Sequence, residues 1–317
     1  MNKLSLIERF LFSNVSIMRN KGLSYGSFGT SLSMLSSDLF HEEEIIQSLV
    51  NSLTKSLSYV IAGSDNSFDT GKLGVGCGLL FLKINKILDS EFDNIFNVSH
   101  QQIIEELEFR QGLNQITDIS YVLHCLIYFC LLSKSESRLT FSTLKSEALF
   151  RDCVRITTEQ IESVSSYFHF EALCIIVKEM LTYSKMTNQN RNIVGNIYKN
   201  LISVGDNAGY LIKDMDLLRL ALGDISSANG NFVQSIINNA AIDTCDYLHY
   251  AGMKSLVGAY NLISETFPLD PNFIQDINDL TFLSTCNPST LMTLRGGYPR
   301  QYLYSSKSLK YVDAILL

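Results

Sequence analysis

Apolar residues recur along the chain in two patterns, and both are typical of α-helices. Residues 45–61 follow an i, i+4, i+8 spacing that is repeated in residues 168–180, which predicts amphipathic helices with one face in water. Residues 73–82 and 121–132 are apolar at almost every position, which predicts helices enclosed by other helices. Strand-like alternation is nearly absent, so the pattern predicts an all-α fold.

Glycine-bearing turns precede most of the apolar runs. The turn glycines are Gly26, Gly29, Gly71, Gly74, Gly76, Gly78, Gly112, Gly252 and Gly296. Gly71 follows Gly26 by 45 residues, Gly112 follows Gly71 by 41, and Gly296 follows Gly252 by 44. A period in the forties indicates either helical pairs or propeller blades, and the helical patterns favour pairs. Glycine at these turns would allow positive φ angles and a close approach of backbones.

The length of 317 residues accommodates about six to seven such pairs. Helical pairs stack either into an open solenoid or into a closed α/α toroid. An open solenoid needs polar caps, but residues 311–317 at the end of the chain are mostly apolar, as in a docked segment. We therefore expect one domain over residues 1–317, an α/α toroid (barrel).

Charge and composition exclude several classes of protein. The net charge of −7 does not suit a protein that binds the phosphate backbone of nucleic acid. No apolar run reaches 18 residues, so we expect no membrane span, and the first residues do not resemble a signal peptide. Seven cysteines, an odd number spread over the chain, are typical of reduced thiols in a cytoplasmic protein.

With these turns in view, the chain resembles the lanthionine synthetase C-like (LanC-like) family. The best match is Gly71-Lys72-Leu73-Gly74-Val75-Gly76-Cys77-Gly78, which is similar to the glycine block that opens an inner helix in that family. Residues 23–29 resemble the preceding block, and residues 311–317 resemble the terminal one. The resemblance implies an α/α toroid that takes part in the maturation of ribosomally synthesised peptides.

Family cyclases hold zinc with a cysteine in one turn and a Cys-His pair in the next, and the zinc activates a peptide thiol. Tyr250 stands at the matching position of the first turn, and Leu294 and Arg295 stand at those of the second. Since these side chains do not form a zinc site of this type, the resemblance implies a zinc-less protein without a cofactor. It would bind a precursor peptide or a partner enzyme, with Tyr250, Arg295 and Tyr298 as candidate contacts. No catalytic residue is assigned.

Two alternatives stay open at this point. Cys245 and His249 are four residues apart, and with Cys286 they could hold zinc for a thioether cyclase with displaced ligands. Asp69 and Asp118 stand near predicted inner-helix starts, and paired carboxylates there would suit a toroidal glycoside-active enzyme. Helix capping is the simpler role for both aspartates. His124, within residues 121–132, is expected in the core rather than at a site.

Overall fold

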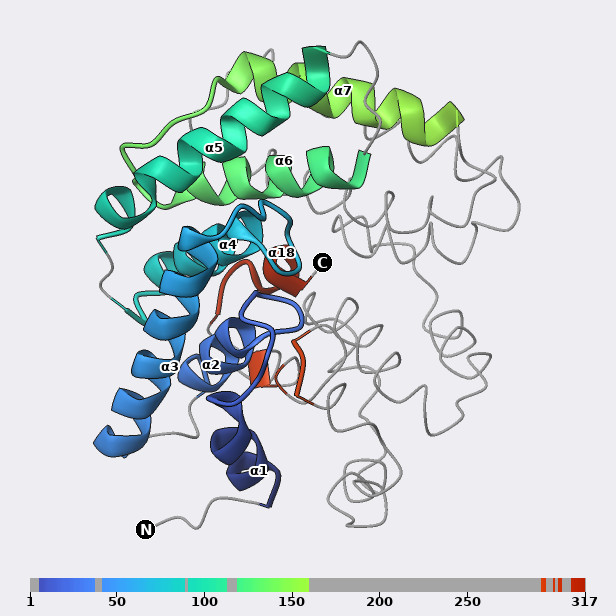
Figure 1. Ribbon diagram of the computed structural model, residues 1–317. Helices are drawn as coiled ribbons and strands as arrows, with labels where there is room; N and C mark the ends of the chain where they lie inside the picture. The colour runs from blue at the N-terminus through green and yellow to red at the C-terminus, as the bar shows by residue number, and fades with distance from the viewer. Residues whose placement is uncertain are drawn as a thin grey trace, which may run out of the picture. The chain divides into compact units, whose positions relative to one another are not determined.

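A computed structural model of the protein describes residues 6–37, 42–88, 91–112, 119–159, 292–294, 299, 302–303 and 309–316. Within these ranges every regular element is an α-helix (Figure 1). The predicted all-α fold is therefore confirmed for this part of the chain. No helix in the described ranges is long and apolar enough to span a membrane.

The chain divides into two compact units, of which the first combines both ends of the sequence, residues 1–89 and 230–316. Its helix α2 contacts α1, α3 and α4, and α4 also contacts α3 and α18 (Figure 1). The bounds of these helices are α1 Leu6–Val15, α2 Ser27–Leu35, α3 Glu43–Ala62, α4 Lys72–Ile84 and α18 Val312–Leu316. The last helix thus lies beside an element more than 200 residues earlier in the chain.

The helices α3 and α4 show the two predicted patterns. In α3 the buried apolar positions are Leu49, Leu53, Leu57 and Val60, which lie on one face, while Glu43 and Glu44 are exposed in the first turn. In α4 every residue from Lys72 to Leu82 is buried. The prediction of an amphipathic helix followed by an enclosed one is confirmed for this pair.

The second unit, residues 90–229, contains α5 (Phe92–Gly112), α6 (Ile119–Lys134) and α7 (Thr143–Glu159) among its described residues. Helix α6 contacts both α5 and α7. It is the enclosed helix here, because all its residues from Tyr121 to Phe129 are buried. His124 is 9% exposed, which confirms the prediction that it lies in the core.

Both enclosed helices α4 and α6 are followed by a residue that is not glycine but adopts positive φ. Lys86 has φ 56° two residues after α4, and Glu136 has φ 56° two residues after α6. The amide of Ile87 donates to the Leu82 carbonyl at 3.0 Å, which is the hydrogen bond of a Schellman C-cap. The two helix ends therefore share a positive φ at equivalent places.

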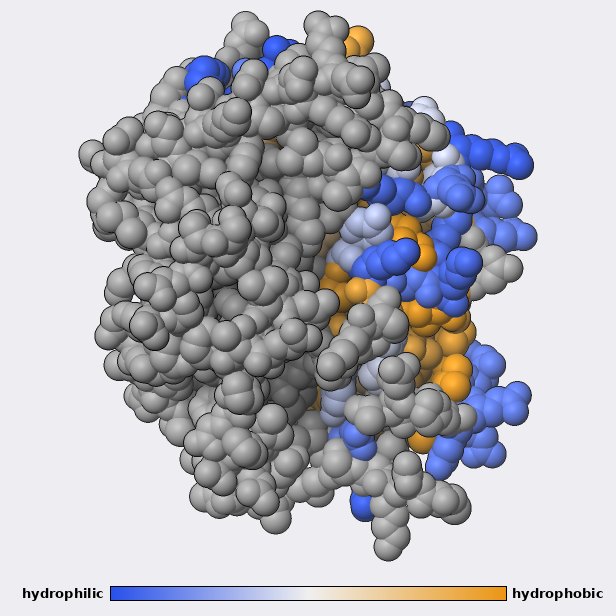
Figure 2. Space-filling model, turned by 180° about the vertical axis from the view of Figure 1, so that it is seen from behind, coloured by the Kyte–Doolittle hydropathy of each residue, from blue (hydrophilic) through white to orange (hydrophobic). Residues whose placement is uncertain are grey.

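Hydrophilic side chains lie outermost on the described part of the face shown in Figure 2, and hydrophobic ones lie further in. Four cysteines fall in the described ranges, and none of the four forms a disulfide. Cys77, Cys125 and Cys153 are buried and Cys130 is half-buried, as expected for reduced core thiols.

Candidate functional site

The turns before α2 and α4 are built by the same hydrogen bonds, 45 residues apart. Each begins with an Asx turn: the Asn20 side-chain oxygen accepts from the Gly22 amide at 2.9 Å, and an Asp65 carboxylate oxygen accepts from the Ser67 amide at 2.8 Å. The backbone carbonyl of Asn20 then accepts from the Ser27 amide at 3.0 Å, and that of Asp65 accepts from the Lys72 amide at 2.9 Å. In each turn the donor is the first amide of the helix. For these two turns, the predicted repeat is therefore also a repeat of backbone geometry.

Glycine is needed inside both helices for space. A Cβ on Gly29 would lie 1.8 Å from the Leu23 carbonyl oxygen, and a Cβ on Gly74 would lie 1.7 Å from the equivalent oxygen of Phe68. The N-cap residues Gly26 and Gly71 have φ of −120° and −107°. The expected close approach is confirmed, but the expected positive φ is wrong for these four glycines.

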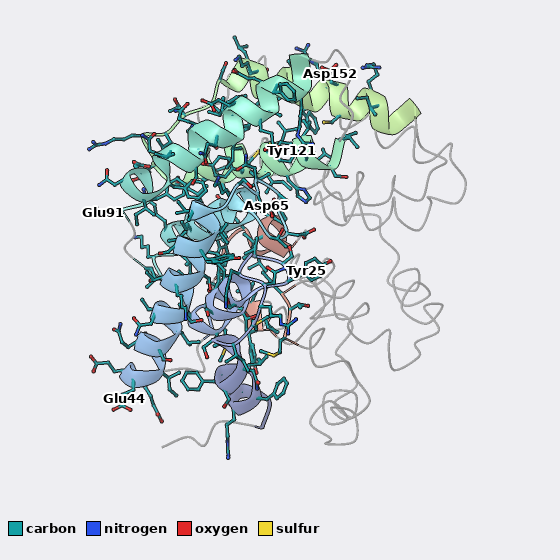
Figure 3. All side chains as sticks on the ribbon, in the orientation of Figure 1. Tyr25, Glu44, Asp65, Glu91, Tyr121 and Asp152 are labelled. Atoms are coloured by element: carbon teal, nitrogen blue, oxygen red, sulfur yellow. The ribbon has the colours of Figure 1, made fainter. Side chains whose placement is uncertain are left out.

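The two turns also pack directly on each other. The Ser24 amide donates to the Asp69 carbonyl at 3.0 Å, and a Cβ on Gly22 would lie 2.3 Å from the Cα of Thr70. Tyr25 and Asp65 mark the two turns in Figure 3. Further along α4, a Cβ on Gly78 would lie 2.5 Å from a ring carbon of Phe28. Neighbouring repeats thus contact each other both through their turns and through their enclosed helices.

A third segment, from the C-terminal part of the chain, packs on α2 in the same way. A Cβ on Gly29 would lie 3.3 Å from the Cβ of Leu294, just as a Cβ on Gly74 would lie 3.0 Å from the Cβ of Leu23. The Thr30 hydroxyl donates to the Met292 carbonyl at 2.6 Å, and the Ser33 hydroxyl donates to the carbonyl of Pro299. Leu294 therefore packs against Gly29 of the first repeat in the way that Leu23 packs against Gly74 of the second repeat.

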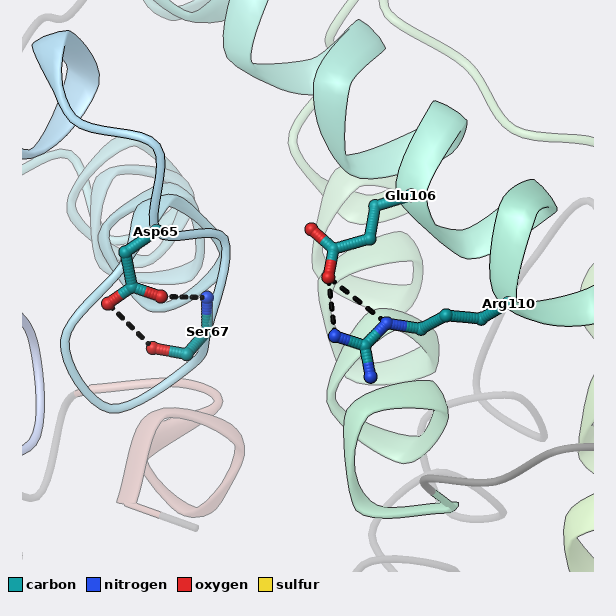
Figure 4. A network of polar contacts seen from close by, with 4 residues as sticks. All are labelled: Asp65, Ser67, Glu106 and Arg110. Carbon is teal, nitrogen blue, oxygen red and sulfur yellow. Dashed lines mark hydrogen bonds and ion pairs between the residues drawn. The ribbon is translucent and has the colours of Figure 1, made fainter.

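Asp65 is the centre of a small polar network in the second turn (Figure 4). Its carboxylate accepts from the hydroxyl of Thr70 at 2.6 Å and from that of Ser67 at 3.1 Å, in addition to the Ser67 amide. Burial opposes ionisation of Asp65, but these hydrogen bonds and the nearby charge of Lys72 outweigh it and lower its pKa. The turn thus carries a stable negative charge.

The second unit has its own polar cluster, where α5 meets the start of α6. Arg110 pairs with Glu106 through Nε at 3.0 Å and Nη2 at 2.5 Å (Figure 4), and its guanidinium lies 4.2 Å from the centre of the Tyr121 ring. Burial raises the pKa of the Tyr121 hydroxyl and of the Cys125 thiol. Because both groups stay protonated at neutral pH, the cluster is suited to holding the helices together and supplies no nucleophile.

Most of the predicted site residues lie outside the described ranges. These are the peptide contacts Tyr250, Arg295 and Tyr298, the alternative zinc ligands Cys245, His249 and Cys286, the turn glycines Gly252 and Gly296, and Asp118. Within the described ranges, no group of three or more His, Cys, Asp or Glu side chains could hold a metal ion. The geometry of these predicted sites is therefore not part of the described structure.

The other predicted residues have clear positions. Asp69 lies in the turn before α4, two residues ahead of Gly71, the N-cap of that helix. Gly76 and Gly78 lie inside α4, and Gly112 is the last residue of α5. The enclosed helices begin at Ser27, Lys72 and Ile119, so their starts are 45 and 47 residues apart.

Sequence reasoning missed the side chains that build the turns. Asn20 and Asp65 each stand six residues before an N-cap glycine, and that shared spacing was a usable signal. Asn85 was also missed: its amide donates to the Lys310 carbonyl at 3.0 Å and accepts from the Lys310 amide at 2.8 Å. No periodic signal in the sequence indicates that contact, because the two residues are 225 positions apart.

Comparison with protein-family models, with curated proteins and with solved structures gave no match to this chain.

Proposed function

We propose that the chain is a LanC-like protein without the zinc ligands of the family cyclases, which binds a precursor peptide or a partner enzyme during peptide maturation. The proposed architecture is a single α/α toroid of about six to seven helical pairs. The observation that carries this proposal is the place of Leu294 beside Gly29, which repeats the place of Leu23 beside Gly74.

This equivalence supports closure of the helical pairs into a ring. If Leu294 and Leu23 hold equivalent places in their repeats, their separation of 271 positions corresponds to six intervals of about 45. The seventh repeat then precedes the first in space, with Thr30 and Ser33 of α2 bonded to it. An open solenoid does not bring its last repeat to its first.

Leu294 also bears on the zinc question. It stands where the resemblance places a zinc-binding cysteine, and it is an apolar side chain that is only 1% exposed and packs next to Gly29. A buried leucine offers no atom to a metal, so this position does not fit the family site. A zinc-less role in recognition is the function that this substitution favours.

Metal analysis of the purified protein separates the proposal from its main alternative. We expect no stoichiometric zinc. One zinc per chain that is lost in Cys286→Ala, and kept in the control Cys130→Ala, would contradict the proposal and support a cyclase that uses Cys245, His249 and Cys286. Cys130 is a suitable control because it is a half-buried thiol on α6 that forms no disulfide.

Peptide binding tests the proposed activity itself. The probe is a labelled precursor peptide encoded next to this protein, and its affinity is measured by fluorescence anisotropy. We expect Tyr250→Ala and Arg295→Ala each to weaken binding about tenfold, in the range of a single interface contact. Tyr59→Ala on α3 is the control, because its side chain is 71% exposed at a distant sequence position. Equal binding by all variants would contradict the assignment of these contacts.

We also place the protein in the cytoplasm, in line with its proposed role. Thiols stay reduced there, and the buried cysteines Cys77, Cys125 and Cys153 form no disulfide. Peptide maturation before export takes place in the same compartment.

A further inference from the structure

The segment between α1 and α2 and the middle of α3 bring two lysines together. Helix α2 contacts α3 (Figure 1), and across this contact the hydroxyl oxygens of Ser27 and Ser56 are 2.7 Å apart. The Ser27 amide also donates to the Asn20 carbonyl at 3.0 Å. The residue after Asn20 and the residue before Ser56 therefore lie near the same end of α2, and these residues are Lys21 and Lys55.

The charges of the two lysines act on each other. Burial and, after it, repulsion by the charge of Lys55 lower the pKa of Lys21. The Nζ of Lys21 donates to the Met18 carbonyl, which holds the partly buried side chain in place. Lys55 is exposed on α3. Two positive charges from different elements thus lie within electrostatic range of each other.

Neither element supplies a carboxylate to compensate these charges. Residues 9–37 contain no Asp or Glu, and the same stretch adds the exposed side chain of Arg19. In residues 45–64, Lys55 is the only charged residue. Among the described residues, Arg19, Lys21 and Lys55 take part in no ion pair. A chain with a net charge of −7 therefore has a locally positive surface here.

This arrangement favours a ligand with several carboxylates. An anion beside Lys21 and Lys55 is attracted by both ammonium groups and reduces the repulsion between them. Complementary charge of this kind steers a partner to the surface and selects it against neutral ones. A long polyanion such as nucleic acid would also meet the negative charge of the rest of the protein, whereas a short acidic segment would not.

We propose that Arg19, Lys21 and Lys55 form a docking surface for a short acidic segment of a partner peptide, whose Asp or Glu carboxylates pair with the three cations. The surface belongs to the first unit and is built by α3 and the segment that precedes α2. The inference does not rest on the proposed contacts Tyr250 and Arg295, and the variants at those positions are tested separately with the precursor peptide.

Fluorescence anisotropy of the full-length protein tests this surface with a labelled synthetic peptide of six glutamates. We expect saturable binding that weakens at high salt, because exposed charge pairs are screened. The double variant Lys21→Gln/Lys55→Gln should bind about tenfold more weakly, as expected for the loss of two exposed charge pairs, and should depend less on salt. The control Lys145→Gln removes a lysine that is already paired with Glu108 at 2.8 Å and should leave binding unchanged.

A second ligand and a single variant complete the test. A labelled peptide of six glutamines has the same length without the charge and should not bind. Lys55→Gln alone, at an exposed position of α3, should weaken binding of the glutamate peptide about threefold. This single variant decides the question if Lys21→Gln disturbs the fold through the loss of its bond to Met18.

Four results would overturn the proposal. The first is the absence of saturable binding of the glutamate peptide by the wild type, and the second is equal binding of the glutamine peptide. The third is an unchanged affinity in the variants at Lys21 and Lys55. The fourth is a dimer, detected by light scattering, that dissociates in Lys55→Gln, since a second copy of the chain would then occupy this surface.

Discussion

Gly74 lies so close to Phe68 that a Cβ on the glycine would stand 1.7 Å from the carbonyl oxygen of the phenylalanine. The same relationship holds one repeat earlier, between Gly29 and Leu23. In both cases the obstruction is backbone, which does not move aside as a flexible side chain does. The turn therefore fixes the chain path into each enclosed helix and requires glycine for space.

Gly74→Ala should lower the free energy of unfolding by about 3 kcal/mol, the upper part of the range for overpacking in a well-packed core. Gly63→Ala is the matched control, because its Cβ would lie 3.4 Å from the Val60 carbonyl oxygen at an exposed helix end. It should change stability by less than about 0.5 kcal/mol. Denaturant titration measures both, and similar losses in the two variants would contradict the steric account.

Lys86→Gly should stabilise the protein by about 0.5–1 kcal/mol, because glycine adopts positive φ without the strain that lysine has at φ 56°. Lys83→Gly, only three residues earlier but inside α4, should instead destabilise by about 1 kcal/mol. Opposite signs in thermal unfolding are the expected result. A loss of stability in Lys86→Gly would show that its side chain has contacts that outweigh the strain.

Asp65 should make stability depend on acid pH. The pKa of Asp65 is lowered in the folded protein, so its ionised carboxylate stabilises the fold at any pH above the unfolded-state pKa of about 3.9. This contribution is lost as the pH falls through the folded-state pKa. Asp65→Asn should therefore be less stable than wild type at pH 6, and the difference should shrink below about pH 4. Asp152→Asn, on the exposed surface of α7, is the control. A difference that is constant from pH 6 to pH 3 would contradict the charge-based explanation.

His100 should give a second pH dependence, nearer neutrality. The ring is buried, its Nδ1 lies 3.0 Å from the Tyr128 hydroxyl, and burial lowers its pKa despite a hydrogen bond to the Thr140 backbone. Because folding lowers the pKa of His100, the free energy of unfolding is greatest above the unfolded-state pKa of about 6.5. It falls as the pH drops from there through the folded-state pKa. Wild type should thus lose more stability between pH 7 and pH 5 than His100→Gln does. Equal losses in chemical unfolding would contradict this role.

The helices were predictable because each buries a regular set of apolar positions. Leu49, Leu53 and Leu57 lie on the face that contacts the rest of the unit, as their spacing predicts. The interval between Gly71 and Gly112 did not predict where the next enclosed helix begins, because Gly112 ends α5 and that helix begins at Ile119. Glycine both fits crowded turns and ends helices, so glycine spacing alone does not identify which role it has.

The long-range contacts were not predictable from the same reasoning. The bond of Thr30 to the Met292 carbonyl uses a backbone atom that every residue carries, so the sequence at position 292 does not indicate it. The contact of Asn85 with Lys310 is of the same kind. An asparagine after an apolar helix suggests a C-cap, and only the fold shows which backbone its amide reaches.

Closure of the repeats is the central claim, since the proposed architecture and the proposed binding role both rest on it. The most direct measurement is cross-linking of a Thr30→Cys/Met292→Cys variant with a short thiol-reactive linker, followed by peptide mapping and determination of the mass of the product. The control pairs Thr54→Cys, on the exposed face of α3, with Met292→Cys. The account predicts an efficient link between positions 30 and 292 within a single chain and little linkage in the control. A folded 30/292 variant that fails to link, or that links only between two chains, would contradict it.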